Sequence, residues 1–143
     1  MTDQNYDPDN IFAKILRGEM PSHVVYEDED TFVMMDIMPR ADGHCLVLPK
    51  EPARNILDAS DAALAAVART TGKVARAAKR AFGADGVTIQ QFNEAAGGQV
   101  VFHLHVHIIP RMAGDKLRPH TGQMADQEVL AAHCAKLKAA LST

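Results

Sequence analysis

Cysteine is scarce in this chain. Its 143 residues include only Cys45 and Cys134, which are too few and too far apart for a disulfide framework or a local zinc motif. Isolated cysteines of this kind usually act as small apolar side chains. We therefore expect both to be packing residues.

Long apolar runs are also missing. No stretch approaches the length that spans a bilayer, and the first ten residues are polar and acidic, without the basic start and apolar centre of a secretory signal. The sequence therefore predicts a cytoplasmic protein with no membrane partner.

The chain carries little net charge, a formal −3 at pH 7. Its basic residues are scattered, except for a set on one face of a predicted helix. That set is Arg69, Lys73, Arg76, Lys79 and Arg80. A solvated helix surface explains this face more simply than a phosphate-binding patch, but both interpretations stay open. The absence of a longer basic stripe argues against a long nucleic-acid partner.

The chain does contain enough apolar residues, 47%, for the core of one domain. We predict a flexible tail over residues 1–10 and a single domain over 11–143. The strands predicted from apolar runs between turn residues are His23–Glu27, Thr31–Ile37, His44–Leu48 and Val87–Phe92. The predicted helices are a short one capped by Asp9 or Asn10, then Ser60–Phe82 and Asp126–Leu141. With a fifth strand, they predict an α+β fold, an antiparallel sheet with helices packed on one face.

That fifth strand contains three histidines in alternation. One face would carry Val101, His103, His105, His107 and Ile109, and the other would be wholly apolar. Same-face residues on a strand stand roughly 6.6 Å apart, so the three imidazoles would form a row about 13 Å long. A single histidine on a strand is usually structural. Three in alternation indicate chemistry, because imidazole is partly neutral and partly protonated near neutral pH.

A metal site is one chemistry that fits the row. Two alternating imidazoles can reach one ion, and His44 could be a remote third ligand. After His107, however, the chain continues through Ile108–Arg111, which supplies a cation where a carboxylate ligand would be expected.

Nucleophilic catalysis on phosphorus is the other chemistry. At pH 7 most imidazole is neutral and nucleophilic, and a neighbouring imidazole can assist a leaving group. The loop before the row supports this interpretation. Its glycines let backbone N–H groups approach a phosphate, and its amides, Asn93 and Gln99, can donate to phosphate or ribose oxygens.

The histidine row and its flanking segments closely resemble the histidine triad (HIT) family of nucleotide-binding proteins. The family's hallmark is three histidines separated by single apolar residues and followed by two more, as in His103–Ile109. The other landmarks, in the family's order, are Ile11–Ile15, Gly18–Pro21, Tyr26–Asp28, Asp36–Pro39, Gly43–Lys50, Asn93 and Gly98–Gln99. The resemblance covers most of the chain.

The resemblance implies a hydrolase or transferase for small purine nucleotides. His105 would attack the α-phosphorus and form a nucleotidyl-histidine that water cleaves, His107 would face the leaving group, and His103 and His44 would order the site from behind. The implied binding residues are Asn93, Gln99 and His107 for phosphate, Asp36 for the ribose hydroxyls, and Ile11, Phe12, Ile15 and Ile37 for the purine. For Asp36 a strand-ending turn role also stays open, as does a core role for Phe12 and the isoleucines.

The resemblance implies no cofactor and a homodimer, joined through the strand Val87–Phe92 and the helix Ser60–Phe82. The chain departs from the family at two places. Val100 stands where many members have Ser or Thr, and cannot hydrogen-bond a leaving group. Asn10 and Ala13 stand where zinc-binding members have cysteines, so no structural zinc is expected. Three further histidines match no motif and are predicted to lie at the surface: His23, His120 and His133.

Three classes of function therefore stay open. They are a nucleotidyl hydrolase, a nucleotide-binding scaffold with vestigial activity, and a metal-dependent enzyme.

Overall fold

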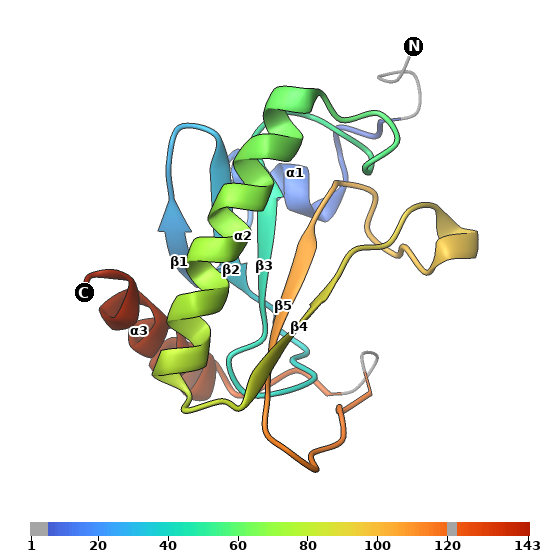
Figure 1. The fold of residues 1–143 in the computed structure, drawn as a ribbon. Helices are drawn as coiled ribbons and strands as arrows, with labels where there is room; N and C mark the ends of the chain where they lie inside the picture. Colours follow the sequence, from blue (N-terminus) through green and yellow to red (C-terminus); the bar gives the residue numbers. More distant parts are fainter. Residues whose placement is uncertain (1–5, 120–122) are drawn as a thin grey trace.

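A five-stranded antiparallel sheet in the order β1-β2-β3-β5-β4 organises the chain, seen here in a computed structural model that describes residues 6–119 and 123–143 (Figure 1). The strands are β1 (Val24–Glu27), β2 (Thr31–Met35), β3 (Cys45–Pro49), β4 (Gly86–Gln90) and β5 (Val106–Arg111). The helices are α1 (Ile11–Leu16), α2 (Asp61–Ala81) and α3 (Gln127–Leu141), with a 3-10 turn η2 (Ala95–Gly97). The predicted fold class is confirmed, as is the antiparallel pairing of β4 with β5.

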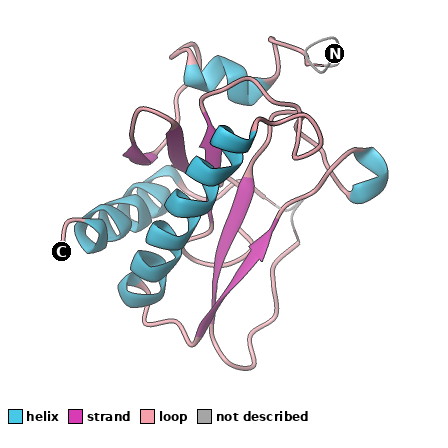
Figure 2. Cartoon of the chain, turned by 45° about the horizontal axis from the view of Figure 1, so that its top comes forward, coloured by secondary structure: helices cyan, strands magenta, loops and turns pink. Residues whose placement is uncertain are grey.

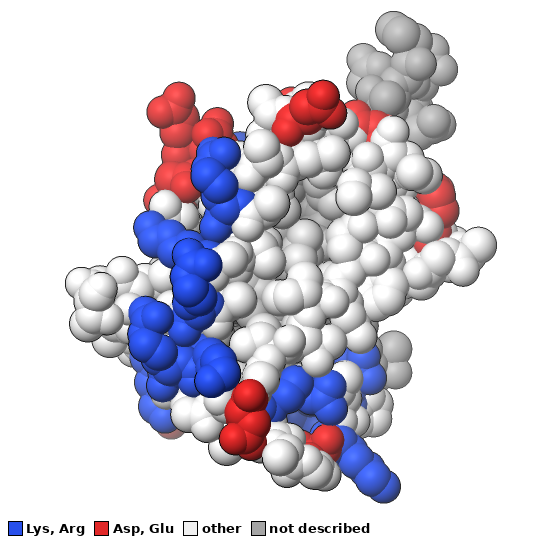
Figure 3. Space-filling view, viewed as in Figure 1, with Lys and Arg blue, Asp and Glu red and all other residues white. Residues whose placement is uncertain are grey.

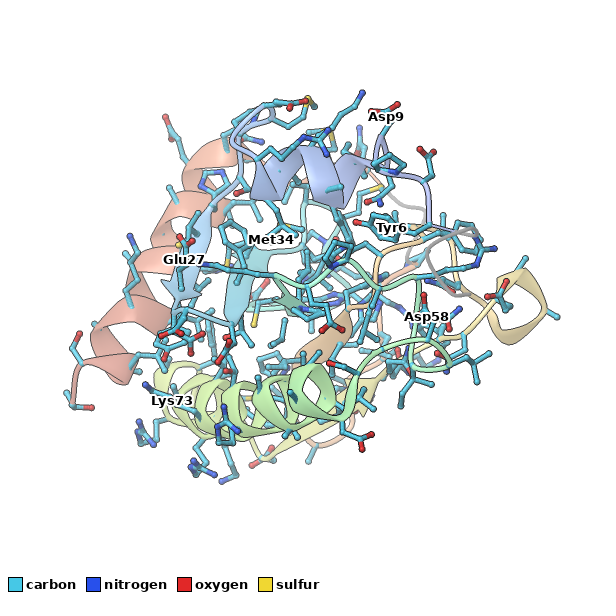
Figure 4. All side chains as sticks on the ribbon, turned by 90° about the horizontal axis from the view of Figure 1, so that it is seen from above. Tyr6, Asp9, Glu27, Met34, Asp58 and Lys73 are labelled. Atoms are coloured by element: carbon cyan, nitrogen blue, oxygen red, sulfur yellow. The ribbon has the colours of Figure 1, made fainter. Side chains whose placement is uncertain are left out.

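Both faces of the central strands are buried. Side chains that alternate along β2, β3 and β5 turn one set toward α2 and α3 and the other toward α1. The first set includes Val33, Met35, Cys45, Val47 and Ile108, and the second is Phe32, Met34, Leu46 and Leu48. Figures 2 and 4 show α1 on one side of the sheet and α2 on the other, and Figure 4 labels Met34 between the sheet and α1. The prediction of helices on one face is therefore wrong for α1.

Both cysteines are buried and unpaired, as predicted. Cys45 lies in the core under α2 and α3, and burial raises the pKa of its thiol to about 12. A thiol that stays protonated at neutral pH behaves as an apolar packing group.

The histidine strand is shorter than predicted. Strand β5 begins at Val106, so His103 and His105 precede it and only His107 lies within it. The main-chain N–H of Leu104 donates to the carbonyl of Ala53 at 2.8 Å, outside the sheet. Because the chain is held by that loop until it joins β3, the predicted row of three imidazoles on one strand face is wrong.

The segment before α1 contacts the domain. Asn10 caps α1 by accepting a hydrogen bond from the N–H of Ala13 at 2.9 Å, and the carbonyl of Pro8 accepts one from Arg17 at 2.6 Å. The hydroxyl of Tyr6 donates to His103 at 2.6 Å. Residues 6–10 of the predicted tail are thus tied to the fold.

The predicted basic face is exposed. Its residues form a column of Lys and Arg along α2 (Figure 3), and the Lys73 ammonium lies 4.4 Å from the centre of the Tyr26 ring. Of the histidines predicted at the surface, His23 and His133 are half-buried, and His120 lies outside the described residues. Among the described residues, no helix combines the length and the apolar character that a membrane span requires.

Candidate active site

A cleft of about 770 Å³ opens between α1 and the second face of the sheet. Its apolar wall contains all four residues predicted to hold a purine: Ile11, Phe12, Ile15 and Ile37. Ile11 and Ile37 are 44% and 41% exposed, so the cleft presents open apolar surface to a ligand. Phe12 and Ile15 also pack against the core beneath α1, so the core and slot roles coexist.

Methionines form much of the remaining apolar wall. They are Met20, Met34, Met35, Met38 and Met124. Sequence reasoning missed them because they come from separate segments and follow no period. Met124 is 59% exposed, and flexible thioether side chains adapt to the shape of a ligand.

His105 lies on the polar wall of the cleft. Its Nδ1 lies 2.7 Å from the carbonyl oxygen of His103. A carbonyl can only accept, so Nδ1 carries the proton and the neutral ring keeps its lone pair on Nε2. The Phe12 ring meets the imidazole edge to face with centroids 4.9 Å apart. The side chain is thereby oriented with a defined nucleophilic nitrogen.

His107 and His44 form a buried pair beside it. The main-chain N–H of Arg40 donates to Nδ1 of His44 at 3.0 Å, which places the His44 proton on Nε2. That group donates to Nδ1 of His107 at 2.9 Å, so a neutral His107 carries its own proton on Nε2. His107 lines the cleft, with its ring centre 5.1 Å from that of His105. The pair thus places an N–H donor beside the nucleophile.

Asp36 joins this pair from the end of β2. Its Oδ1 accepts a hydrogen bond from the N–H of Met38 at 2.8 Å, which is the turn role considered from the sequence. Its Oδ2 lies 3.4 Å from Nε2 of His44 and 4.0 Å from Nδ1 of His107. The carboxylate also lines the cleft, so the turn role leaves the ribose role open.

The sequence argument that no carboxylate accompanies the histidines is therefore wrong. Ligand atoms of Asp36, His44 and His107 lie within 4.8 Å of one another, a spacing that would suit a metal ion. To bind a metal ion beside Asp36, however, His44 would need a lone pair on Nε2. Because Nδ1 of His44 accepts a hydrogen bond from the N–H of Arg40, the ring carries its proton on Nε2. The donor set does not fit a metal in this arrangement.

His103 lies outside the cleft. It is fully buried, with Nε2 donating to the carbonyl of Pro49 at 2.9 Å and Nδ1 accepting from Tyr6. Burial is the main cause that lowers its pKa. Its contribution to the site is the main-chain carbonyl that orients His105.

Gln99 and Asn93 mainly hold their own loop. The Gln99 amide donates to the carbonyls of Arg54 and Val101 and accepts from Asn55 and from the N–H of Glu94. These contacts use its full donor and acceptor capacity. Asn93 bonds to Gln91 and to the N–H of Ile56, and lies outside the residues that line the cleft. Val100 lines the cleft and is 74% exposed.

An ion pair between Arg54 and Glu94 closes the loop. Both guanidinium contacts are short, 2.8 and 2.9 Å, and Asn55 donates to the same carboxylate at 2.6 Å. These hydrogen bonds lower the pKa of Glu94 to about 2, and the bonds from Arg54 have the largest effect. Glu94 has φ 67, a backbone conformation that non-glycine residues seldom adopt. Sequence reasoning missed this group, since Arg54 and Glu94 are 40 residues apart.

Comparison with known proteins places this geometry in context. The HIT domain family matches residues 17–114. A solved structure described as a Hit-like protein involved in cell-cycle regulation from Bartonella henselae, with unknown ligand, shares 51% identity and a TM-score of 0.89, covering 94% of this chain and 98% of that one.

Two curated relatives are also similar. An uncharacterised HIT-like protein of Methanocaldococcus jannaschii is 42% identical over 73% of this chain and 81% of its own length. Adenylylsulfatase HINT3 of Arabidopsis thaliana is 35% identical over 79% of this chain and 60% of its own.

Proposed function

The chain belongs to the HIT domain family of nucleotide-binding hydrolases and transferases, and on that premise we propose that it hydrolyses purine nucleotide conjugates at the α-phosphate through a covalent nucleotidyl-His105 intermediate. The substrates would be nucleoside phosphoramidates, acyl-adenylates or dinucleoside polyphosphates, each releasing a nucleoside monophosphate. The adenylylsulfatase relative supports an adenylyl group as the part retained.

One observation carries the proposal, the 2.7 Å hydrogen bond from Nδ1 of His105 to the carbonyl of His103. It leaves the lone pair on Nε2 at the cleft. That nitrogen attacks phosphorus, an N–P bond forms, and the bond to the leaving group breaks. His107 provides the N–H that hydrogen-bonds the leaving group.

Water then attacks phosphorus and breaks the N–P bond. Overall one water is consumed, with its hydroxyl on phosphorus and its proton on the leaving group. His105 is regenerated.

Binding follows from the two walls of the cleft. The apolar wall stacks the purine, and Asp36 accepts the ribose hydroxyls. The roles implied for Asn93 and Gln99 at the phosphates require their internal hydrogen bonds to rearrange, so we assign these side chains to shaping the loop first.

Trapping the intermediate tests the proposal. Adenosine phosphoramidate labelled at the α-phosphorus should label the wild-type chain, with the label on His105 by mass spectrometry. His105→Ala should take up no label and lose turnover at least a thousandfold, whereas His133→Ala, at a half-buried histidine outside the cleft wall, should match wild type. Turnover without a label at His105 would contradict the proposal.

The same assay separates the other two classes. An acyl-adenylate and a dinucleoside polyphosphate are run beside the phosphoramidate, each with and without EDTA. We expect turnover to survive chelation, because the nucleophile is an imidazole and the His44 proton opposes a metal at that pair. Loss of activity in EDTA, restored by zinc, would establish metal dependence. Tight AMP binding without turnover of any substrate would favour the scaffold.

A further inference from the structure

A second cavity, of about 490 Å³, lies between the end of α2, helix α3, and the segments 40–42 and 110–118. Its wall is strongly cationic. The basic side chains are Arg40, Arg111, Lys116, Arg118 and Lys136, and the acidic ones are Asp42 and Asp115. Five basic side chains against two acidic ones leave a formal excess of three positive charges, in a chain whose formal net charge is −3. Lys and Arg side chains gather at this lower end of the molecule in Figure 3.

Neutral oxygens orient two of the guanidinium groups. Arg111 donates to the Thr88 hydroxyl at 3.1 Å and to the Asp115 carbonyl at 3.2 Å. Arg40 donates through Nε to the carbonyl of Arg118 at 2.9 Å. These bonds hold the side chains in place without cancelling their charge, which stays available to an anion.

The two segments that carry the cations are tied together. The N–H of Arg118 donates to the carbonyl of Arg40 at 2.9 Å, and its side chain pairs with Asp42 at 3.1 Å. On the helical side, the Lys136 ammonium lies 5.4 Å from the centre of the Phe82 ring, and His133 packs against the same ring at 5.2 Å. The basic groups therefore come from several elements that are connected to one another.

We propose that this cavity is a binding site for a small, multiply charged oxyanion, next to the histidine cleft, with which it shares Arg40. Its volume lies within the range of small-molecule sites, about 300 to 1,000 Å³. Arginine forks and lysine ammonium groups are the side chains that bind phosphate and carboxylate groups. A phosphate compound and a polycarboxylate share this chemistry, and the titration distinguishes them. The proposal does not depend on the proposed hydrolase activity.

Amide chemical-shift mapping tests the site in the intact chain. Pyrophosphate, and separately citrate, are titrated at constant ionic strength, with the amides of Lys116, Arg118 and Lys136 reporting the cavity and those of His105 and His107 the cleft. The variant Lys116→Glu with Lys136→Glu reverses two charges of the wall. The control, Lys79→Glu with Lys138→Glu, makes the same change in net charge at exposed residues outside the wall.

We expect saturable shifts at the cavity amides in wild type, at least tenfold weaker binding in the cavity variant, and unchanged binding in the control. Stronger binding of pyrophosphate than of citrate identifies phosphate compounds as the ligand class, and the reverse identifies polycarboxylates. Shifts confined to the cleft amides, or an equal loss in both double variants, would overturn the proposal. All of the substituted lysines are exposed, and a dispersed spectrum verifies that each variant is folded.

Discussion

At the residue scale, the chemistry of the cleft depends on which ring nitrogen carries each proton. A main-chain carbonyl decides this for His105 and a main-chain N–H decides it for His44. Both partners belong to the backbone, which does not change protonation state near neutral pH, so the tautomers are set by the fold.

Replacing Asp36 by Ala should weaken nucleotide binding through the ribose. Loss of charge-assisted hydrogen bonds worth about 1.5 to 3 kcal/mol would raise the dissociation constant for AMP by about one to two powers of ten. Wild type should bind the 2′-deoxy nucleotide poorly compared with AMP. The variant should bind the 2′-deoxy nucleotide no more weakly than it binds AMP. Titration calorimetry with both ligands measures this, with Asp61→Ala, at an exposed carboxylate in the first turn of α2 outside both cavities, as the control. Unchanged discrimination in a folded Asp36→Ala chain would leave Asp36 only its turn role.

The buried His103 should make the free energy of unfolding depend on pH. Burial lowers its pKa below the ordinary 6.5, so as the pH falls below 6.5 the unfolded chain binds a proton that the folded chain does not. The contribution of His103 to the free energy of unfolding is fully present above pH 6.5. It should fall on acidification by up to about 1.4 kcal/mol per pH unit, until the pKa of His103 in the folded chain is reached.

Urea unfolding from pH 7.5 to 5 measures this dependence. His103→Gln should be less stable overall, with a flatter pH dependence than wild type. His133→Gln, at a half-buried histidine that packs on Phe82, is the comparison. An equally steep dependence in His103→Gln would assign the acid sensitivity to other groups.

At the element scale, the short helix α1 is the weakest wall of the cleft. A helix of six residues is marginal without capping and packing, yet it carries Ile11, Phe12 and Ile15. Asn10→Ala should cost about 1 kcal/mol and, by loosening α1, raise the dissociation constant for AMP several-fold.

Ser60→Ala is the matched control for that change. It removes the equivalent cap of α2, where Ser60 accepts from the N–H of Ala63 at 3.1 Å, and Ser60 lies outside the cleft wall. It should lower the melting temperature by a similar amount and leave AMP binding unchanged. Equal effects of both variants on binding would mean that α1 does not shape the slot.

At the scale of the whole molecule, the edge strand β4 predicts self-association. An unpaired strand edge needs covering, and Ile89 in β4 is 46% exposed. We expect a homodimer in sedimentation at micromolar concentration, and Ile89→Lys should shift it toward monomer. Val129→Lys, at an α3 residue that is 45% exposed, should remain dimeric. A monomeric wild-type chain would contradict the expectation.

The sequence by itself determined the elements and the family. Periodicity places β1 to β4 and all three helices within about two residues of the observed ends, because alternation and capping depend on neighbouring residues. The histidine motif and its flanking landmarks were sufficient to identify the HIT family, which the domain match confirms.

Only the tertiary structure decided how the site is assembled. Leu104 bonds to Ala53, which turns His103 out of the row, and Asp36 reaches the His44–His107 pair from another strand. The proton on His44 depends on Arg40, and the methionine wall and the cationic cavity gather residues from separate segments. Such contacts join residues that are distant along the chain, or they are made by backbone groups. Local sequence patterns therefore do not predict them.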